Sequence, residues 1–286
     1  MKSRLTFKNI SISVTWFWLT AFALIPCFFM LMTSLVEQGD SELIRLQLTL
    51  SNYVQFFNPL YLKIFLRSLE ISILVTALCL FLGYPFASIL TRLPKQLKNI
   101  FLLLVIIPFW TSSLVRTYAI VVILKTKGLL NGLLLSLGLI HQPLQLLYTD
   151  TATIIGLVYS LLPFMILPLY TNLDKLDHRV LDAARDLGAN PWQVFWHILL
   201  PLTIPGIIAG SILVFLPAMS LFYISNILGG AKTMLIGNLI ENQFLAARNW
   251  PMGATISVIL TLVMGCLLLA YAKSRKLESE NSEHLL

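Results

Sequence analysis

The chain is poor in charged residues. Asp, Glu, Lys and Arg make up 12% of its 286 residues, while 57% are hydrophobic. A typical soluble domain has about 25% charged residues, so this deficit excludes a soluble fold and predicts an integral membrane protein in a lipid bilayer. The net charge of +7 comes from basic residues dispersed at the ends of apolar runs. Because they form no basic patch, we do not expect nucleic acid as a partner.

Residues for redox, metal or nucleotide chemistry are also scarce. The three cysteines, Cys27, Cys79 and Cys266, lie inside apolar runs without metal-ligand spacing, and the four histidines are far apart in the sequence. The segment 229–233, Gly-Gly-Ala-Lys-Thr, lacks the Gly-Lys-Ser/Thr ending of a phosphate-binding loop at the required spacing. We therefore expect a chain that is not an enzyme and binds no cofactor or metal itself.

Long apolar runs are abundant. A helix needs about 20 apolar residues to cross the hydrocarbon core. Six runs meet this requirement, at residues 11–35, 69–90, 100–122, 151–170, 202–224 and 251–271. We predict an all-α integral membrane protein with six transmembrane helices in one domain, residues 11–272. Residues 1–10 form a short N-terminal segment and residues 273–286 a C-terminal tail. The first run exceeds the about 7–15 residues of a signal-peptide core, so we expect it to remain as a span.

The distribution of Lys and Arg between the connections predicts the orientation, because cytoplasmic loops carry more of them. Twelve fall on one side: Lys2, Arg4, Lys8, Arg92, Lys95, Lys98, Lys175, Arg179, Arg185, Lys273, Arg275 and Lys276. Seven fall on the other: Arg45, Lys63, Arg67, Lys125, Lys127, Lys232 and Arg248. This bias places both termini, and the loop between the fourth and fifth runs, in the cytoplasm.

That loop, residues 181–201, is a polar island between two apolar runs. Leu181, Ala184 and Leu187 recur at helical spacing with charged residues between them, which predicts a short amphipathic helix. Gly188 follows directly. Because glycine adopts positive φ at low cost, we expect the helix to end there.

A second short helix should begin at Asn190 and Pro191, since Asn is a good N-cap and Pro suits the first helical position. The prediction is two helices that meet at a sharp bend. The adjacent small residues Ala183 and Ala184 leave a low surface that a partner's groove can approach closely. An amphipathic helix lying on lipid headgroups fits the same pattern, and the residues alone favour neither.

The spacing in this loop resembles the EAA loop of permease subunits of ABC importers. Asp182-Ala183-Ala184 is followed by three residues and Gly188, then by nine residues, Ile198, one residue and Leu200-Pro201. Asp182 stands where the family usually has Glu, which keeps the charge on a shorter side chain. The resemblance implies the fold of a type I ABC importer permease, with this loop as the cytoplasmic coupling helix that seats in an ATPase subunit. The residues that it assigns to coupling are Asp182, Ala183, Ala184, Gly188, Ile198, Leu200 and Pro201.

Four other segments resemble spermidine/putrescine importer permeases of the PotB type. They are residues 108–111, Pro-Phe-Trp-Thr; 127–131, Lys-Gly-Leu-Leu-Asn; 162–165, Leu-Pro-Phe-Met; and 229–232, Gly-Gly-Ala-Lys. The resemblance implies ATP-driven polyamine import across a bacterial inner membrane. It also implies three kinds of partner: a second, different permease subunit, an ABC ATPase dimer and a periplasmic polyamine-binding protein.

The spans contain helix-disrupting and small residues. Each proline removes a backbone hydrogen bond and kinks its helix, which suits a pathway that opens and closes. Proline is also commoner in membrane helices generally, so any one position fits either explanation. The positions are Pro85, Pro108, Pro163, Pro168, Pro205 and Pro217. Gly206 and Gly210 form a small-xxx-small pair, which predicts close approach of a neighbouring helix.

Aromatic and polar residues suggest a path for a cationic solute. Ring faces attract ammonium groups by about 0.5–2 kcal/mol each. An aromatic belt at the membrane interface is the equal alternative. The residues that we assign to the path are Trp110, Tyr159, Phe222, Tyr223 and Asn226, with Glu241 as an outer acidic contact.

Two ionisable residues fall within or at the edge of predicted spans. We expect Glu70 to pair with Arg67 near the outer surface. Arg116 either serves the path or extends its guanidinium to the interface.

Two other classes of protein share some of these features. An ion-coupled secondary transporter also has kinked helices but often shows inverted repeats, which we do not find in this sequence. A membrane scaffold needs neither a kinked pathway nor an ATPase dock. Among ABC importers, the nearest alternative cargoes are a metal-ion chelate and an organic anion. Preference between putrescine and spermidine is expected to reside in the binding protein.

Overall fold

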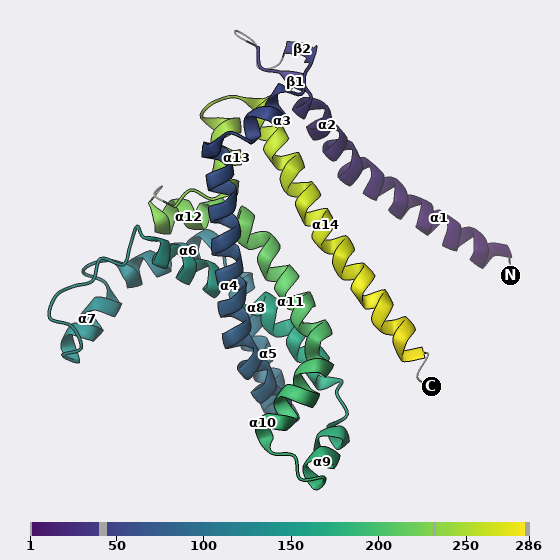
Figure 1. Ribbon diagram of the computed structural model, residues 1–286, viewed down its shortest axis with the longest axis vertical. Helices are drawn as coiled ribbons and strands as arrows, with labels where there is room; N and C mark the ends of the chain where they lie inside the picture. The colour runs from purple at the N-terminus through teal and green to yellow at the C-terminus, as the bar shows by residue number, and fades with distance from the viewer. Residues whose placement is uncertain (1, 40–44, 231–232, 284–286) are drawn as a thin grey trace. The chain divides into compact units, whose positions relative to one another are not determined.

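The structure, a computed structural model, describes residues 2–39, 45–230 and 233–283. In the described residues the regular secondary structure is helical, apart from one two-stranded sheet (Figure 1). The chain forms two compact units, which are described separately. The first comprises Met1–Lys63 and Leu239–Cys266, and the second comprises Ile64–Asn238 and Leu267–Leu286.

The first unit begins with α1 (Lys2–Leu19), a π-helical turn η1 (Thr20–Leu24) and α2 (Ile25–Ser34) in succession. Strands β1 (Val36–Glu37) and β2 (Arg45–Leu48) pair antiparallel, and α3 (Ser51–Phe56) follows. The Asn52 side chain donates to the carbonyls of Ser34 and Val36, at 3.2 and 2.8 Å. Thr255 of α14 (Trp250–Glu283) donates to the same Ser34 carbonyl, at 3.2 Å. These bonds fasten α2, the hairpin and α14 to one another.

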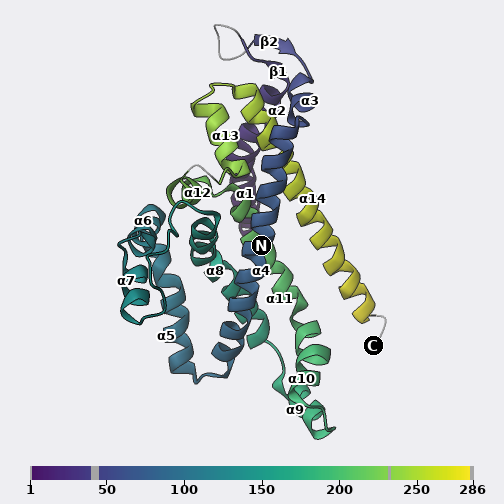
Figure 2. The same cartoon turned by 60° about the vertical axis from the view of Figure 1, so that its left-hand side comes forward.

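The second unit contains most of the remaining helices. In chain order they are α4 (Pro59–Arg92), α5 (Lys95–Ile106), the 3₁₀ turn η2 (Ile107–Trp110), α6 (Ser113–Leu124), α7 (Leu129–Ser136), α8 (Asp150–Asp174), α9 (His178–Asp186), α10 (Pro191–Val194), the π-helical turn η3 (Phe195–Leu199), α11 (Leu200–Ser220) and α12 (Phe222–Gly229). Three helices are divided between the units: α4 begins in the first unit and continues into the second at Ile64, α13 (Ile236–Leu245) starts in the second and continues into the first, and α14 passes from the first into the second at Leu267. Helix α8 is central, because it packs on α11, α12 and α6 (Figure 2).

Small residues let α8 and α11 approach closely. A Cβ atom built on Gly210 would lie 2.7 Å from the Met165 sulfur, and one on Gly206 would lie 2.7 Å from the Asn172 Cβ. Real Cβ atoms essentially never show such contacts, so a larger residue at either position forces the neighbouring side chains of α8 to shift. The close approach predicted from the Gly206–Gly210 pair is therefore confirmed, with α8 as the partner helix.

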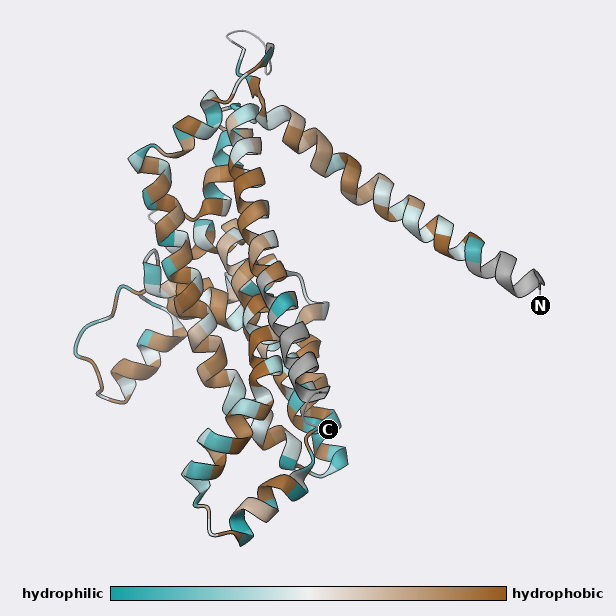
Figure 3. Cartoon of the chain, turned by 45° about the vertical axis from the view of Figure 1, so that its right-hand side comes forward, coloured by the Kyte–Doolittle hydropathy of each residue, from teal (hydrophilic) through white to brown (hydrophobic). Residues whose placement is uncertain are grey.

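Six helical segments in the described residues are long and apolar enough to span a membrane. They are Asn9–Ser34, Pro59–Arg92, Ser113–Ser136, Asp150–Asp174, Pro191–Ser220 and Trp250–Leu269. The six predicted spans are thus confirmed in number. Figure 3 shows that the long helices of both units carry mainly hydrophobic residues. This arrangement suits lipid, where helices satisfy their own backbone groups and expose apolar side chains.

The predicted third span, residues 100–122, is wrong as one continuous helix. Helix α5 ends at Ile106, the chain tightens into η2, and Thr111 and Ser112 are extended, with ψ of 149° and 133°. Pro108 has no N–H to donate and so cannot continue the α-helical hydrogen bonding. The spanning candidate in this region is shifted to Ser113–Ser136 and contains the turn between α6 and α7.

The predicted fifth span, residues 202–224, also differs at both ends. The helical segment starts eleven residues earlier, at Pro191, and stops at Ser220. Leu221 then leaves the helical region, with φ −72° and ψ 72°, and α12 starts at Phe222. The Ser220 carbonyl faces the backbone of Gly237, where an added Cβ would lie 2.4 Å from the oxygen. The loop helix and the fifth span are therefore one continuous helical segment.

Replacement of Gly210 by Val tests the importance of the close contact between α8 and α11. The added Cβ overlaps the Met165 sulfur, so we expect a loss of about 1–3 kcal/mol from overpacking and a lower midpoint of thermal unfolding in detergent. Gly132→Ala is the matched control, because a Cβ at this α7 position has no neighbour within 4 Å. An unchanged midpoint for Gly210→Val would contradict the packing described here.

Candidate functional site

Residues 181–201, called the elbow below, form the predicted pair of helices. Helix α9 is capped by the Asp177 carboxylate, which accepts from the Arg179 N–H at 3.0 Å. The helix ends before Gly188, whose φ is +88°. Asn190 and Gln193 then form a reciprocal capping box, at 2.8 and 2.9 Å, which starts α10. The bend and its two caps, Gly188 and Asn190, are confirmed.

A small apolar cluster holds the two helices of the elbow together. Leu181, Ala184 and Val194 are buried in it, with Ile198 packed against them. Ala184 is only 9% exposed, whereas its neighbour Ala183 is exposed. The expectation that both alanines share a low outer surface is therefore wrong, because Ala184 points into the bend and only Ala183 is on the outside.

The outer surface of the elbow carries large apolar side chains that sequence reasoning missed. Leu187 is 89% exposed and Trp192 is 70% exposed. Leu187 was expected on the same apolar face as Leu181, but α9 ends at Asp186 and the chain turns away before that face continues. The Asp182 carboxylate accepts from the Arg185 guanidinium at 3.2 Å on the same helix. Exposed aromatic and aliphatic groups beside charges are typical of protein interaction sites.

The remaining residues assigned to coupling lie where the elbow joins α11. Ile198 is half-buried in the elbow cluster, Leu200 is half-buried against the main core, and Pro201 is exposed. Within η3 the Leu200 N–H bonds to the carbonyl of Phe195, five residues earlier, and Pro201 has no N–H to donate. A π-helical turn thus marks the junction, as is frequent at functional sites.

A buried polar contact fastens this junction to α4. The Tyr84 hydroxyl and the Thr203 hydroxyl lie 3.0 Å apart. Thr203 donates to the carbonyls of Leu199 and Leu200, so Tyr84 donates to Thr203. The Tyr84 ring also meets the Phe195 ring edge to face, with centroids 5.7 Å apart. The junction of the elbow with α11 is therefore attached to α4.

An ion pair joins the end of α8 to α5. The Lys98 ammonium lies 2.7 Å from the Asp174 carboxylate and 5.8 Å from the centre of the Tyr170 ring. The hydrogen bond to Asp174 raises the pKa of Lys98 above its ordinary value. Asp174 is the last residue of α8, so this pair ties the helix end that precedes α9 to α5.

The predicted path residues are spread over several helices. Trp110, at the end of η2, is 79% exposed, and Tyr159 on α8 is also exposed. Glu241 lies on α13 within the first unit, and the other five lie in the second. The role of these three residues in the path remains a prediction.

Helix α12 carries the remaining three path residues. The Phe222 and Tyr223 rings meet edge to face, with centroids 6.2 Å apart. The hydroxyl oxygens of Tyr223 and Ser113 lie 2.5 Å apart. The Asn226 side-chain oxygen accepts from Asn238 at 2.7 Å. Phe222, Tyr223 and Asn226 all lie on the same short helix, and their role in the path remains a prediction.

Arg67 is the centre of a polar network between distant parts of the second unit. Its guanidinium donates to Glu70 at 2.7 Å, so the predicted pair is confirmed. It also donates to Asp150, at the start of α8, at 2.5 Å. Asp150 accepts a further hydrogen bond from the Thr233 hydroxyl. Neither Asp150 nor Thr233 could be predicted from local sequence, because Asp150 lies 83 residues after Arg67 and Thr233 lies 83 residues after Asp150.

Arg116 packs on an aromatic ring. Its guanidinium carbon lies 5.6 Å from the centre of the Phe109 ring, a favourable cation–π distance. Its Nε atom is buried and has no hydrogen-bond partner among the described residues. The ring contact anchors Arg116 to η2, and its role in transport remains a prediction.

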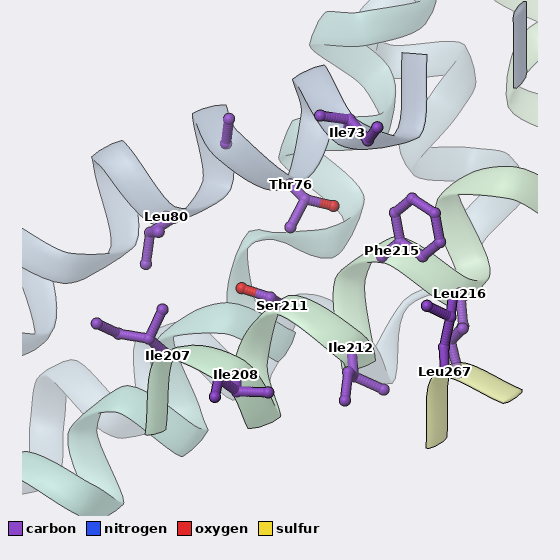
Figure 4. A pocket seen from close by; sticks show the side chains of 11 residues that line it. Ile73, Thr76, Leu80, Ile207, Ile208, Ser211, Ile212, Phe215, Leu216 and Leu267 are labelled. Atoms are coloured by element: carbon purple, nitrogen blue, oxygen red, sulfur yellow. The ribbon is translucent and has the colours of Figure 1, made fainter. Parts of the chain in front are cut away.

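A groove between α4 and α11 is almost entirely apolar. Figure 4 shows Ile73, Thr76 and Leu80 facing Ser211 and Phe215 across it. The lining residues within the described part of the chain are hydrocarbon apart from the two hydroxyls, and Thr76 already donates to the Ser72 carbonyl at 2.7 Å. Such a groove offers a charged solute only the lone pairs of two hydroxyl groups.

Other predicted features fall partly outside the described residues. Residues 231 and 232 of the 229–232 segment lie outside them, while Gly230 adopts a φ of +58°. Among the described residues, no group of three or more His, Cys, Asp or Glu side chains has a geometry that could hold a metal ion.

The chain is similar to a known protein family, to named sequence relatives and to solved structures. The family model for binding-protein-dependent transport system inner membrane components matches residues 80–277. The spermidine/putrescine transport system permease protein PotB of Salmonella typhimurium (strain LT2) is 48% identical over 277 residues, covering 97% of this chain and 96% of the relative. The PotB protein of Escherichia coli (strain K12) is 48% identical over 266 residues, covering 93% and 97%. A solved structure of a bacterial alginate ABC transporter in complex with an alginate pentasaccharide-bound periplasmic protein contains a chain with a TM-score of 0.77, at 15% identity and 96% coverage of both chains.

Six spanning helices with an elbow before the fifth define a permease subunit of an inner-membrane transporter, which is a transport component rather than an enzyme. The chain belongs to the family of binding-protein-dependent transport system inner membrane components. The resemblance to PotB-type permeases noted from short segments therefore extends over nearly its whole length.

Replacement of Arg67 tests the polar network. Arg67→Leu leaves Glu70 and Asp150 without their shared cation, and we expect a double-mutant cycle with Asp150→Asn to give a coupling free energy of about 0.5–1 kcal/mol. The measurement is the unfolding free energy in mixed micelles. Lys63→Leu, four residues earlier on α4, is the control and should leave stability nearly unchanged. Additive effects of Arg67→Leu and Asp150→Asn would rule out the bridge.

Proposed function

We propose that this chain is one of two different permease subunits of an ATP-driven importer of polyamines. The observation that carries the cargo assignment is the 48% identity to spermidine/putrescine permeases over 97% of the chain. The partners are a second permease, an ABC ATPase dimer and a periplasmic polyamine-binding protein. Both termini and the elbow face the cytoplasm, as the distribution of Lys and Arg indicates.

The proposed drive is mechanical. ATP binding closes the ATPase dimer and draws the elbow inward with it, and the kinked spans then open outward to receive the solute. Hydrolysis resets the path toward the cytoplasm. Support comes from the continuity of α10, η3 and α11, since a load applied to the elbow passes along one helical segment. The Tyr84–Thr203 contact passes the same load to α4.

The outer surface of the elbow is the proposed ATPase contact. Leu187, Trp192 and Ala183 are exposed there, and the Asp182–Arg185 pair sets the charge pattern around them. The apolar groups supply contact area, and the charges supply register. Gly188 and Ala184 contribute to the ATPase contact indirectly. Gly188 allows the bend, and Ala184 packs in the apolar cluster inside it.

The path for a polyamine must bind ammonium groups weakly enough to release them. Aromatic rings and neutral oxygen acceptors meet this requirement better than clustered carboxylates do. Phe222, Tyr223 and Asn226 on α12 offer such groups and remain the proposed path residues, with Trp110, Tyr159 and Glu241 as further candidates. The Glu70 and Asp150 carboxylates are already occupied by Arg67.

Uptake by the reconstituted complex tests the function. The two permeases, the ATPase and the binding protein are placed in proteoliposomes with ATP inside, and radiolabelled spermidine and putrescine are added outside. We expect ATP-dependent accumulation that persists after ionophores dissipate all ion gradients. Accumulation that needs a gradient but not ATP would identify a secondary transporter. Accumulation of molybdate or a metal chelate in place of polyamines would overturn the cargo assignment.

Cysteine crosslinking tests the elbow contact with two adjacent positions. After replacement of Cys27, Cys79 and Cys266 by Ser, a single Cys is introduced at Ala183 or at Ala184. We expect a short bifunctional reagent to link Ala183→Cys to the ATPase in the assembled complex, because this position is exposed. Ala184→Cys should give at least about tenfold less product, since that side chain is inside the bend. Equal labelling, or capture of lipid only, would contradict the proposed docking surface.

A further inference from the structure

Helices α8 and α11 line a second, open cavity, which differs in chemical character from the apolar groove. Its volume is about 440 Å³, within the range of about 300–1,000 Å³ typical of small-molecule sites. Phe164, Thr171 and Asn172 line it from α8, and Gly206 and Ala209 line it from α11. It therefore lies along the same close contact that joins these two helices.

Asn172 supplies a buried acceptor in this cavity. Its Oδ1 atom is buried and has no hydrogen-bond partner among the described residues. Gly206 leaves the space that the Asn172 side chain occupies, because a Cβ there would lie 2.7 Å from the Asn172 Cβ and 3.3 Å from Oδ1. A buried acceptor without a donor is costly, so this position is suited to a ligand that brings the donor.

Apart from the Lys175 ammonium, the other polar groups around the cavity are acceptors as well. The Thr171 hydroxyl donates its hydrogen to the Leu167 carbonyl at 2.8 Å, which leaves only lone pairs for a ligand. Pro168 and Pro205 also line the cavity and have no N–H to give to the carbonyls four residues earlier. None of the described lining residues is a carboxylate. Acceptors thus outnumber donors around the Asn172 oxygen, and a ligand that brings hydrogen-bond donors fits this part of the cavity.

A protonated primary amine has this chemistry, since an ammonium group has three donors and no acceptor. Anions and metal chelates present mainly acceptors. We infer that the cavity between α8 and α11 is a subsite for one protonated amino group of the transported polyamine, with Asn172 Oδ1 as its acceptor. The inference rests on the proposed function and adds a binding position that lies apart from α12.

Two further lining residues, Phe164 and Lys175, change the affinity of this subsite for an ammonium group in opposite directions. The exposed face of Phe164 offers a cation–π contact, and its ring is held edge to face against Phe109, 5.1 Å away. Lys175 also lines the cavity and carries a charge of the same sign as the cargo. This like charge lowers the affinity for an ammonium group, which favours release over retention.

Two replacements of Asn172 with opposite expected effects test the inference. The assembled complex, without ATP and binding protein, is placed in nanodiscs, and binding of radiolabelled spermidine is measured at equilibrium. Asn172→Leu removes the acceptor at similar volume and should weaken binding about tenfold or more, as expected for a hydrogen bond to a charged group. Asn172→Asp keeps the shape, adds a negative charge and should strengthen binding severalfold. Lys175→Gln should also strengthen it.

The outcomes separate a binding role from a packing role. If Asn172 only packs against Gly206, both replacements should weaken binding together with thermal stability, and the inference fails. If both variants bind spermidine as the unmodified complex does, the inference also fails, while ATP-driven uptake by the unmodified complex keeps the proposed function. If the unmodified complex imports no polyamine, the proposed function itself fails.

Discussion

The contact between α8 and α11 is the constraint on which the second unit depends. Gly206 and Gly210 allow the two backbones to approach until side chains of α8 touch the backbone of α11. Lipid supplies no hydrophobic force between helices, so such close van der Waals packing is a main source of helix association in a membrane. Helix α8 also packs against α12 and α6, so the helix that α11 contacts holds these two helices as well.

The same helix α11 extends without interruption into the elbow. η3 and α10 precede the N-terminal end of α11 without a break, and the chain bends away only at Gly188. The elbow is therefore the protruding end of a packed helix and not a loop between two spans. Tyr84 and Thr203 add a second attachment where the protruding part enters the bundle. A force on the elbow is transmitted along α10 and η3 to α11, whose packed part lies in the core.

Local features of the sequence predicted the local features of the structure. The number of spans, the end of α9 before Gly188, the capping box at Asn190 and the pair of Arg67 with Glu70 all depend on residues within a few positions of one another. Features that depend on distant residues were missed. Asp150 joins Arg67 from another helix, and the face of α9 that contains Ala184 is buried only because α10 folds back on it. The breaks at Thr111 and Leu221 were missed because hydropathy does not distinguish one apolar helix from two in succession.

The π-helical turn η3 has a geometric consequence for the elbow. A π-helical turn amounts to one residue inserted into an α-helix, and one residue corresponds to about 100° of rotation about the helix axis. The insertion thus sets the rotation of α10 about the helix axis relative to α11, and with it the direction in which Trp192 points. A chain shortened by one residue at this point would keep both helices and the bend but would aim the elbow in a different direction.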